Sequence, residues 1–290
     1  VIGSTVKPEV AVIYDWENRW AIDDLNGLGR ERRFYAETCI NHYRPFWSMG
    51  VPVDVIPEWA DFTPYKLIAA PMLYMLLPGV AERLRQFVAD GGTLVSTYWS
   101  GIVDETDLCF LGGWPGAGLR EVFGIWDEEI DTVTPEERNR VIMAEGNPLG
   151  LTGSYEARDY FALIHAEGAQ VLATFGSDFY AGRPALTVNK FGRGQAYYMA
   201  SRNDDRFLAD FYGKLAGRLN LLRALPVDLP QGVTAQLRSD GENRFIFVMN
   251  FNPQPAAVNL GSASYQNLVT GAQVSGVLEL PGYGVEVLKA

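Results

Sequence analysis

Cysteine and histidine are scarce in this sequence, with two residues of each among 290. Cys39 and Cys109 are too few for a disulfide framework, and no Cys-x-x-Cys pair is present, which argues against a structural zinc site. His42 and His165 are the only side chains that offer an imidazole base. Chemistry that depends on several cysteines or histidines is therefore not expected.

Long apolar runs and excess positive charge are also lacking. No stretch of 18 or more apolar residues is present, so we predict no membrane span. The net charge of −11 argues against a nucleic-acid partner, which requires clustered Lys and Arg. Residues 1–7 do not have the charged and apolar regions of a signal peptide, and we predict a cytoplasmic location.

What the sequence does contain is a globular pattern, with 48% hydrophobic and 12% aromatic residues. Over the first 200 residues, short apolar runs alternate with helical patterns, which is typical of an open, mostly parallel sheet with helices on both faces. We expect helices from about Arg30 to Ser48, from Pro78 up to Gly91-Gly92, which ends the helix, and from Asp205 to Leu222. For residues 112–168 we expect a less regular region that contains only scattered short elements. Strands are expected at 9–14, 52–56, 66–70, 93–97, 170–175, 184–189 and 195–200.

The pattern changes after Leu225-Pro226. Helical periods end, and short strands separated by turn residues follow, such as 233–238 and 244–250. This predicts a small, sandwich-like antiparallel β domain. We therefore place the domains at residues 1–224 and 225–290.

Ser100 is the one candidate nucleophile, because Tyr98-Trp99-Ser100-Gly101 follows a predicted strand and resembles a nucleophile elbow. Such an elbow has glycine two residues before the nucleophile, where this sequence has Tyr98. A serine nucleophile also requires a base, and neither histidine lies beside Ser100 in the sequence. A structural turn is the favoured interpretation.

Three other patterns resemble sites without meeting their requirements. Asp104, Glu105 and Asp107 could bind a hard cation, but they lack the spacing of a calcium loop, and a solvated or interface loop is favoured. Gly192-x-Gly194 is too short for a dinucleotide fingerprint, and the glycines at 112–118 have no lysine of a phosphate loop. We therefore predict no catalytic, cofactor-binding or metal-binding residue in this chain.

Tryptophan is abundant, and several of the seven residues are expected in loops, where aromatic rings serve interfaces or stack on sugars. The charged group Arg30–Arg33 is either a solvated face or an inter-subunit salt-bridge patch. The candidates for an interface are Trp16, Trp20, Trp99, Trp114 and Arg30–Arg33.

Several segments, taken in order, resemble the β-galactosidases of glycoside hydrolase family 42. Val10–Asn18 resembles the start of that family's middle domain, and Leu67–Tyr74 resembles its third strand. Phe87–Val95 and Tyr98–Glu105 are similar to its central strand and the following loop. Gly192–Tyr198 and Asp204–Phe207 continue a similarity that covers essentially the whole chain.

This resemblance implies a middle domain with a class I glutamine amidotransferase fold that mediates trimerisation, followed by a small C-terminal β domain. The amidotransferase cysteine and His-x-Glu motif have no counterpart, since the chain reads Tyr98-Trp-Ser-Gly101 and Ser201-Arg-Asn-Asp204. The catalytic glutamate pair is expected in a barrel upstream of Val1, so no glutamate here inherits that role.

We therefore expect the non-catalytic trimerisation and C-terminal domains of a retaining β-galactosidase, with no cofactor. The expected partners are the protein's own catalytic barrel and further subunits of a homotrimer, and a galactoside would be met only through the parent enzyme. The alternatives are an autonomous amidotransferase-like hydrolase that uses Ser100, or a carbohydrate-binding module. The β domain has no tryptophan and only Tyr265 and Tyr283 as sugar platforms.

Overall fold

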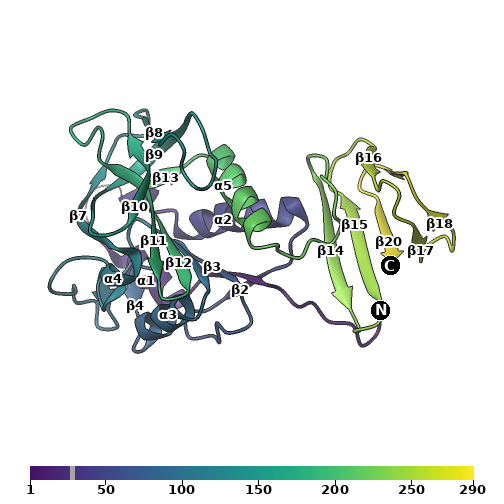
Figure 1. Cartoon of the computed structure of the whole chain (residues 1–290), viewed down its shortest axis with the longest axis horizontal. Helices are drawn as coiled ribbons and strands as arrows, with labels where there is room; N and C mark the ends of the chain where they lie inside the picture. Colours follow the sequence, from purple (N-terminus) through teal and green to yellow (C-terminus); the bar gives the residue numbers. More distant parts are fainter. Residues whose placement is uncertain (27–29) are drawn as a thin grey trace. The chain divides into compact units, whose positions relative to one another are not determined.

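The computed structural model describes residues 1–26 and 30–290 (Figure 1). The chain forms two compact units. The first, which we call the α/β unit, comprises Ala11–His42 and Val55–Leu215. The second, the β unit, comprises Val1–Val10, Tyr43–Asp54 and Ala216–Ala290.

An 11-stranded sheet organises the first part of the fold, in the order β13-β9-β8-β10-β11-β12-β5-β3-β1-β2, with β7 paired to β9. At its centre β5 pairs in parallel with β3 and with β12, and an antiparallel region extends from β12 towards β13. The strands are β1 (Val10–Ile13), β2 (Val53–Ile56), β3 (Leu67–Ala70), β5 (Thr93–Thr97), β7 (Ile125–Thr132), β8 (Asn139–Met143), β9 (Ser154–Ala166), β10 (Gln170–Phe175), β11 (Pro184–Phe191), β12 (Gly194–Met199) and β13 (Ser201–Asn203).

Helices flank this sheet. They are α1 (Trp16–Asp24), the short 3₁₀ helix η1 (Arg30–Arg32), α2 (Tyr35–Met49), α3 (Val80–Ala89), α4 (Leu119–Phe123) and α5 (Asp205–Arg218). Helices α3 and α4 pack together and against β12, whereas α2 and α5 meet on the other side of the sheet in Figure 1. The predicted fold class, a mostly parallel central sheet with helices and a separate small antiparallel sheet, is confirmed. None of the helices in the described residues is both long and apolar enough to cross a membrane.

Buried apolar side chains explain why α3 lies where it does. Val80, Leu84 and Val88 recur at helical spacing and are at most 1% exposed. The helix ends at Gly91-Gly92, and a Cβ on Gly92 would lie only 2.4 Å from the Phe87 ring. Glycine therefore allows the chain to turn directly from α3 into β5.

The first half of the chain differs from the prediction in two places. The predicted helix from Arg30 is broken, because Phe34 adopts a positive φ of 50° between η1 and α2. Helix α1, which carries Trp16 and Trp20, is not among the predicted helices. This helix begins because the Asp15 carboxylate accepts hydrogen bonds from the N–H groups of Glu17 (2.9 Å) and Asn18 (3.3 Å).

The predicted looseness of residues 112–168 is also wrong. This region contains β7, β8 and β9, and β9 alone has 13 residues. These strands carry charged residues on exposed positions, such as Glu128 and Glu156, while Phe161 and Ile164 are buried. The longest unbroken apolar run in these strands, residues 160–164, covers only part of β9, and the rest of the three strands mixes charged and apolar residues.

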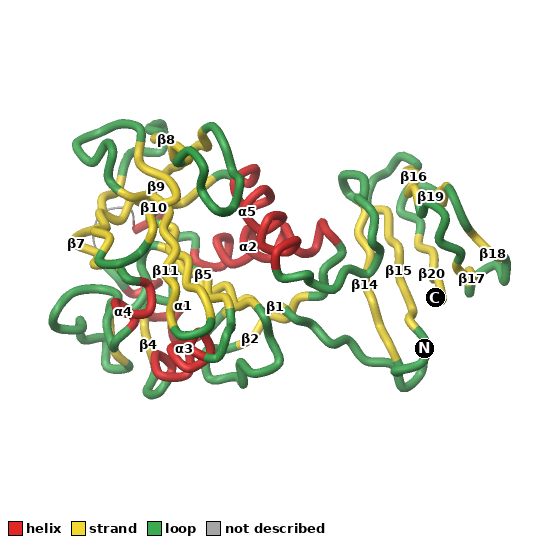
Figure 2. The backbone as a smooth tube through the Cα atoms, in the orientation of Figure 1, coloured by secondary structure: helices red, strands yellow, loops and turns green. Residues whose placement is uncertain are grey.

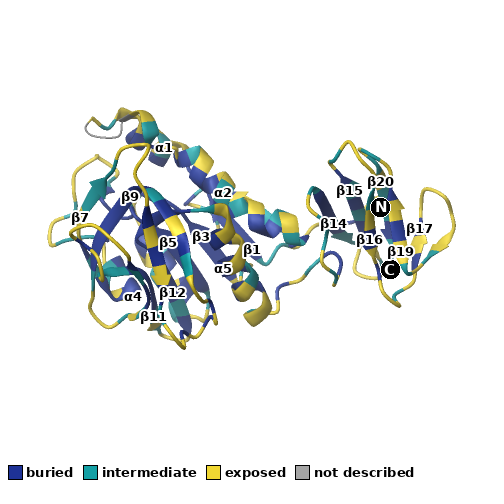
Figure 3. Ribbon diagram, turned by 90° about the horizontal axis from the view of Figure 1, so that it is seen from above, coloured by how far each residue is buried: buried dark blue, intermediate teal, exposed yellow. Residues whose placement is uncertain are grey.

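The β unit contains its own sheets (Figure 2). A five-stranded antiparallel sheet has the order β14-β15-β20-β17-β18, and β16 pairs with β19. Alternate residues of β14 and β15, including Val233, Ala235 and Val248, are buried in the unit's core (Figure 3). The strands are β14 (Val233–Ser239), β15 (Arg244–Asn250), β16 (Ala256–Asn259), β17 (Tyr265–Asn267), β18 (Gln273–Val274), β19 (Val277–Leu280) and β20 (Val285–Lys289).

Candidate functional site

The turn after β5 is the first candidate site, because it follows the carboxyl end of a central parallel strand. Trp99 has a positive φ of 59° and Gly101 a φ of 64°. The strained position, which holds the nucleophile in an elbow, is therefore occupied by Trp99 rather than Ser100. In a nucleophile elbow a glycine lies two residues after the nucleophile, and Gly101 lies two residues after Trp99. This spacing in the sequence is the signal that Trp99, and not Ser100, occupies the strained position. The half-buried indole packs on Tyr160, with ring centroids 4.9 Å apart.

Ser100 has a structural role in this turn. It is 1% exposed, and its Oγ accepts a hydrogen bond from the Leu73 N–H (3.2 Å) and lies 2.9 Å from Ser96 Oγ. The adjacent Met72 N–H donates to Thr97 Oγ1 (2.8 Å). Two backbone donors that could have stabilised an oxyanion are thus already bonded to hydroxyls.

The two histidines also have other partners. His42 is buried, and its Nδ1 lies 2.6 Å from the Tyr212 hydroxyl. Burial, and then the charge of Arg202, lower the pKa of His42 to about 3, so that it is neutral at physiological pH. His165 Nε2 lies 2.7 Å from Glu128 Oε2, and its ring stacks on Trp126. These partners occupy both imidazoles away from Ser100, which argues against a hydrolytic triad.

We expect Ser100→Ala to leave any catalytic activity unchanged and to lower the free energy of unfolding by about 1–2 kcal/mol, because it leaves the buried Leu73 N–H without an acceptor. Thermal unfolding of the variant and the wild type measures this. Thr63→Ala is the control, since that hydroxyl bonds to Asp61 on the exposed surface and should contribute little. A hydrolytic activity that disappears in Ser100→Ala would restore the nucleophile hypothesis.

The arginines at 30–33 are largely occupied within the α/β unit. Arg32 pairs with Asp159 (3.2 Å) and donates to the Val133 carbonyl (2.7 Å). Arg33 is buried and donates to the carbonyls of Ile22 and Asp23. The side chain of Arg30 lies outside the described part. Arg32 and Arg33 therefore anchor the segment before α2, and they do not form a free salt-bridge patch.

The tryptophans divide into two groups. Trp16, Trp20 and Trp59 are 56%, 62% and 69% exposed, whereas Trp99 and Trp114 are half-buried. The three exposed rings border two adjoining hollows on the α/β unit, of about 800 and 630 Å³. Glu17, Trp20 and Leu77 line both hollows, and we call the combined surface the aromatic groove.

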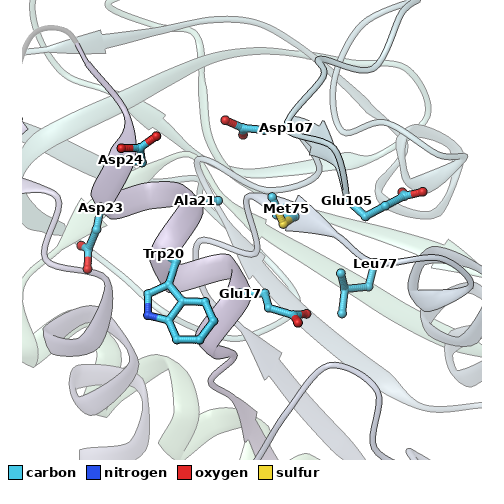
Figure 4. Close-up of a pocket in the computed structure, with 9 residues that line it drawn as sticks. All are labelled: Glu17, Trp20, Ala21, Asp23, Asp24, Met75, Leu77, Glu105 and Asp107. Atoms are coloured by element: carbon cyan, nitrogen blue, oxygen red, sulfur yellow. The ribbon is translucent and has the colours of Figure 1, made fainter.

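Carboxylates line one part of this groove. Figure 4 shows α1, carrying Glu17 and Trp20, on one side of the larger hollow, and the segment of Glu105 and Asp107 on the other. Asp104 takes no part, because its carboxylate accepts hydrogen bonds from Thr106 and from the Leu108 N–H, and these bonds to Thr106 lower its pKa. In residues 1–26 and 30–290, no three His, Cys, Asp or Glu side chains are grouped so that they could hold a metal ion.

A fully buried carboxyl group lies below the groove. Glu58 is 0% exposed, and its Oε1 accepts a hydrogen bond from the Leu77 N–H (3.0 Å). Its Oε2 has no hydrogen-bond partner among the residues that the structure describes. Burial, followed by the nearby Asp15 carboxylate, raises the pKa of Glu58 to about 8. Its chain neighbours Pro57 and Trp59 line the smaller hollow.

These features define an α/β domain whose hydrolase-like turn contains no accessible nucleophile, followed by a small antiparallel β unit. Residues 8–222 match the family model of the β-galactosidase trimerisation domain, and residues 232–290 match that of the β-galactosidase C-terminal domain. The chain belongs to the β-galactosidases of glycoside hydrolase family 42, as a trimerisation domain with its C-terminal domain.

Relatives with this name cover the whole chain. The β-galactosidase Pbg of Clostridium perfringens is 55% identical over 100% of this chain, and BglY of Alicyclobacillus acidocaldarius is 50% identical over 99%. The crystal structure of a cold-adapted β-galactosidase from Rahnella sp. R3 has a TM-score of 0.95 and 51% identity over 99% of this chain and 41% of its own. The present chain spans 42% of the length of these two curated relatives.

Proposed function

We propose that this chain is the assembly part of a β-galactosidase that hydrolyses terminal β-galactosides with retention of configuration. The observation that carries the proposal is the ordered match of the trimerisation and C-terminal domain models over residues 8–222 and 232–290. Relatives named β-galactosidase extend well beyond the length of this chain, which leaves room for a catalytic barrel elsewhere in the polypeptide.

In this proposal no residue of the chain is catalytic and none binds a cofactor or metal. The hydrogen bonds of Ser100 and the separate partners of His42 and His165 support that view. The partners are the protein's own barrel and two further copies, in the cytoplasm, with neither nucleic acid nor membrane as a partner. The net charge of −11 agrees with a protein that does not bind nucleic acid.

We also propose that the domain boundary lies at residues 224–225. Strands β14 to β20 form sheets of their own, and the two family models are separated by residues 223–231. The end of α2 nevertheless belongs with the β unit, because Trp47 packs on Phe251 (5.3 Å) and its carbonyl accepts a hydrogen bond from Thr234 Oγ1 (2.6 Å). A separately expressed 225–290 fragment would expose this contact surface.

The assembly role predicts that the chain forms trimers, with three times the 32.1 kDa mass of one chain. A closed three-fold ring repeats one heterologous contact between two different surface patches. Light scattering over a concentration series measures the mass, and we expect trimer to dominate by about 100 μM, the range of a weak but specific association. A strictly monomeric mass throughout that series would contradict the role.

A further inference from the structure

We propose that the aromatic groove is the acidic half of the contact between subunits, and that its occupant is an arginine-bearing surface of a neighbouring copy of the same polypeptide. This inference rests on the proposed trimer. It adds which surface of the α/β unit is used and what chemistry the opposing surface must have.

Large aromatic side chains are exposed around the groove. Trp16, Trp20 and Trp59 are all more than half exposed, and Val55, which lines the same groove, is 58% exposed. Isolated exposed apolar residues are ordinary, but three tryptophans around one depression form a patch of the kind that marks an interface. Trp16 and Trp20 lie four residues apart on α1, with ring centroids 6.3 Å apart, so they present one continuous surface.

Carboxylates surround these rings. Glu17, Glu105 and Asp107 line the larger hollow with Trp20, and among the described residues no arginine, lysine or histidine forms an ion pair with them. Neighbouring Asp23 is paired with Arg19. The fully buried Glu58 adds no charge at neutral pH, because its raised pKa keeps this carboxyl group protonated. Carboxylates gathered around a low-dielectric depression attract a cationic partner.

The residues of the groove favour one kind of cation. The described carboxylates do not gather as a metal-ligand set, so they suit a larger, delocalised cation better than a metal ion. Guanidinium combines hydrogen bonds to carboxylates with stacking on an indole. The groove already contains one such arrangement, since Arg19 lies 5.2 Å from the centroid of Trp16 and pairs with Asp23. Trp20 and Glu17 offer the same combination without an internal arginine.

The symmetry of the proposed trimer restricts what can occupy the groove. In a closed ring, the surface that meets the groove must be a different part of the same polypeptide, because the contact is heterologous. Two acidic patches would repel each other, so the complementary patch must be basic. A neighbouring subunit that presents arginine satisfies both the geometry and the charge.

The test measures the concentration at which half of the 290-residue chain is trimeric, by sedimentation at low and high salt. We expect the triple variant Glu17→Gln/Glu105→Gln/Asp107→Asn to raise this concentration roughly tenfold at low salt and to remove most of its salt dependence. Trp20→Ala should raise it about 30-fold at both salt concentrations, as expected for an aromatic anchor. Circular dichroism shows whether each variant keeps its fold.

The control variant Glu136→Gln/Glu145→Gln/Glu279→Gln removes the same charge from exposed positions outside the groove and should change neither value. If the groove variants form trimers with wild-type stability and salt dependence, the inference is overturned, while the trimeric role stands. If chelation weakens the trimer and added Ca²⁺ restores it, the groove binds a metal ion and the arginine occupant is wrong. A monomeric wild-type chain overturns both the role and the inference.

Discussion

The purified 290-residue chain will release no nitrophenol from a chromogenic β-galactoside, whereas a full-length relative such as the Clostridium perfringens β-galactosidase will do so under the same conditions. A retaining glycosidase requires two carboxyl groups about 5–5.5 Å apart that are open to the sugar. One is the nucleophile, and the other must have a raised pKa to act as an acid. Loss of the pair removes both covalent and acid–base catalysis.

Asp15 and Glu58 are two neighbouring carboxyl groups, one of which has a raised pKa. The Glu58 N–H lies within hydrogen-bonding distance of the Asp15 carboxylate (3.4 Å), and the pKa of Glu58 is raised to about 8. Both side chains are nonetheless buried, at 3% and 0% exposure, and Asp15 also caps α1. A galactoside therefore cannot reach them in this structure.

The assay includes Glu58→Gln and Ser100→Ala as additional variants. Turnover that survives repurification and is lost on changing one carboxyl group of this chain would contradict the proposed absence of catalytic residues. Turnover that is equal in all variants indicates a contaminating enzyme. Glutaminase activity, measured in parallel, should also be absent, because the strained position of the elbow is occupied by Trp99.

The elements that the sequence predicts best are those whose buried residues form a regular pattern. Strands β1, β3 and β5 have an unbroken apolar or fully buried pattern, and α3 has a regular apolar face. Helix α1 escapes prediction for the opposite reason. Its largest apolar residues, Trp16 and Trp20, point to solvent at i and i+4, and the buried position between them is Asn18.

The candidate site was predictable only in part. Exposed tryptophans could be proposed as interface residues from their number, and Trp16 and Trp20 do lie on the surface, whereas Trp99 and Trp114 are half-buried. Glu58 could not be identified, because its burial depends on Leu77 and Asp15, which are 19 and 43 residues away in the sequence. Its environment arises from tertiary packing, and sequence spacing contains no sign of it.

Glu58→Gln will stabilise the chain at and above pH 8, by roughly 2–4 kcal/mol. The pKa of this carboxyl group is raised from an ordinary value of 4.5 to about 8, chiefly by burial. The folded state therefore holds a proton that the unfolded state releases above about pH 4.5. As a result, the Glu58 contribution to the free energy of unfolding falls as the pH rises from about 5 to 8, and it is most favourable at low pH.

The amide introduced by Glu58→Gln stays neutral at every pH and keeps a carbonyl acceptor for the Leu77 N–H, so this loss of stability should disappear. Chemical denaturation of the variant and the wild type at intervals from pH 5 to 9 measures the difference. Asp127, whose pKa burial raises to about 7, gives both proteins a similar trend, and only the difference between them reports on Glu58. The exposed Glu136→Gln variant should follow the wild type at every pH. A Glu58→Gln curve that runs parallel to the wild type would show that Glu58 has the same pKa in the folded and unfolded states, and a variant less stable at pH 8 would show that its ionised form is stabilised by the fold.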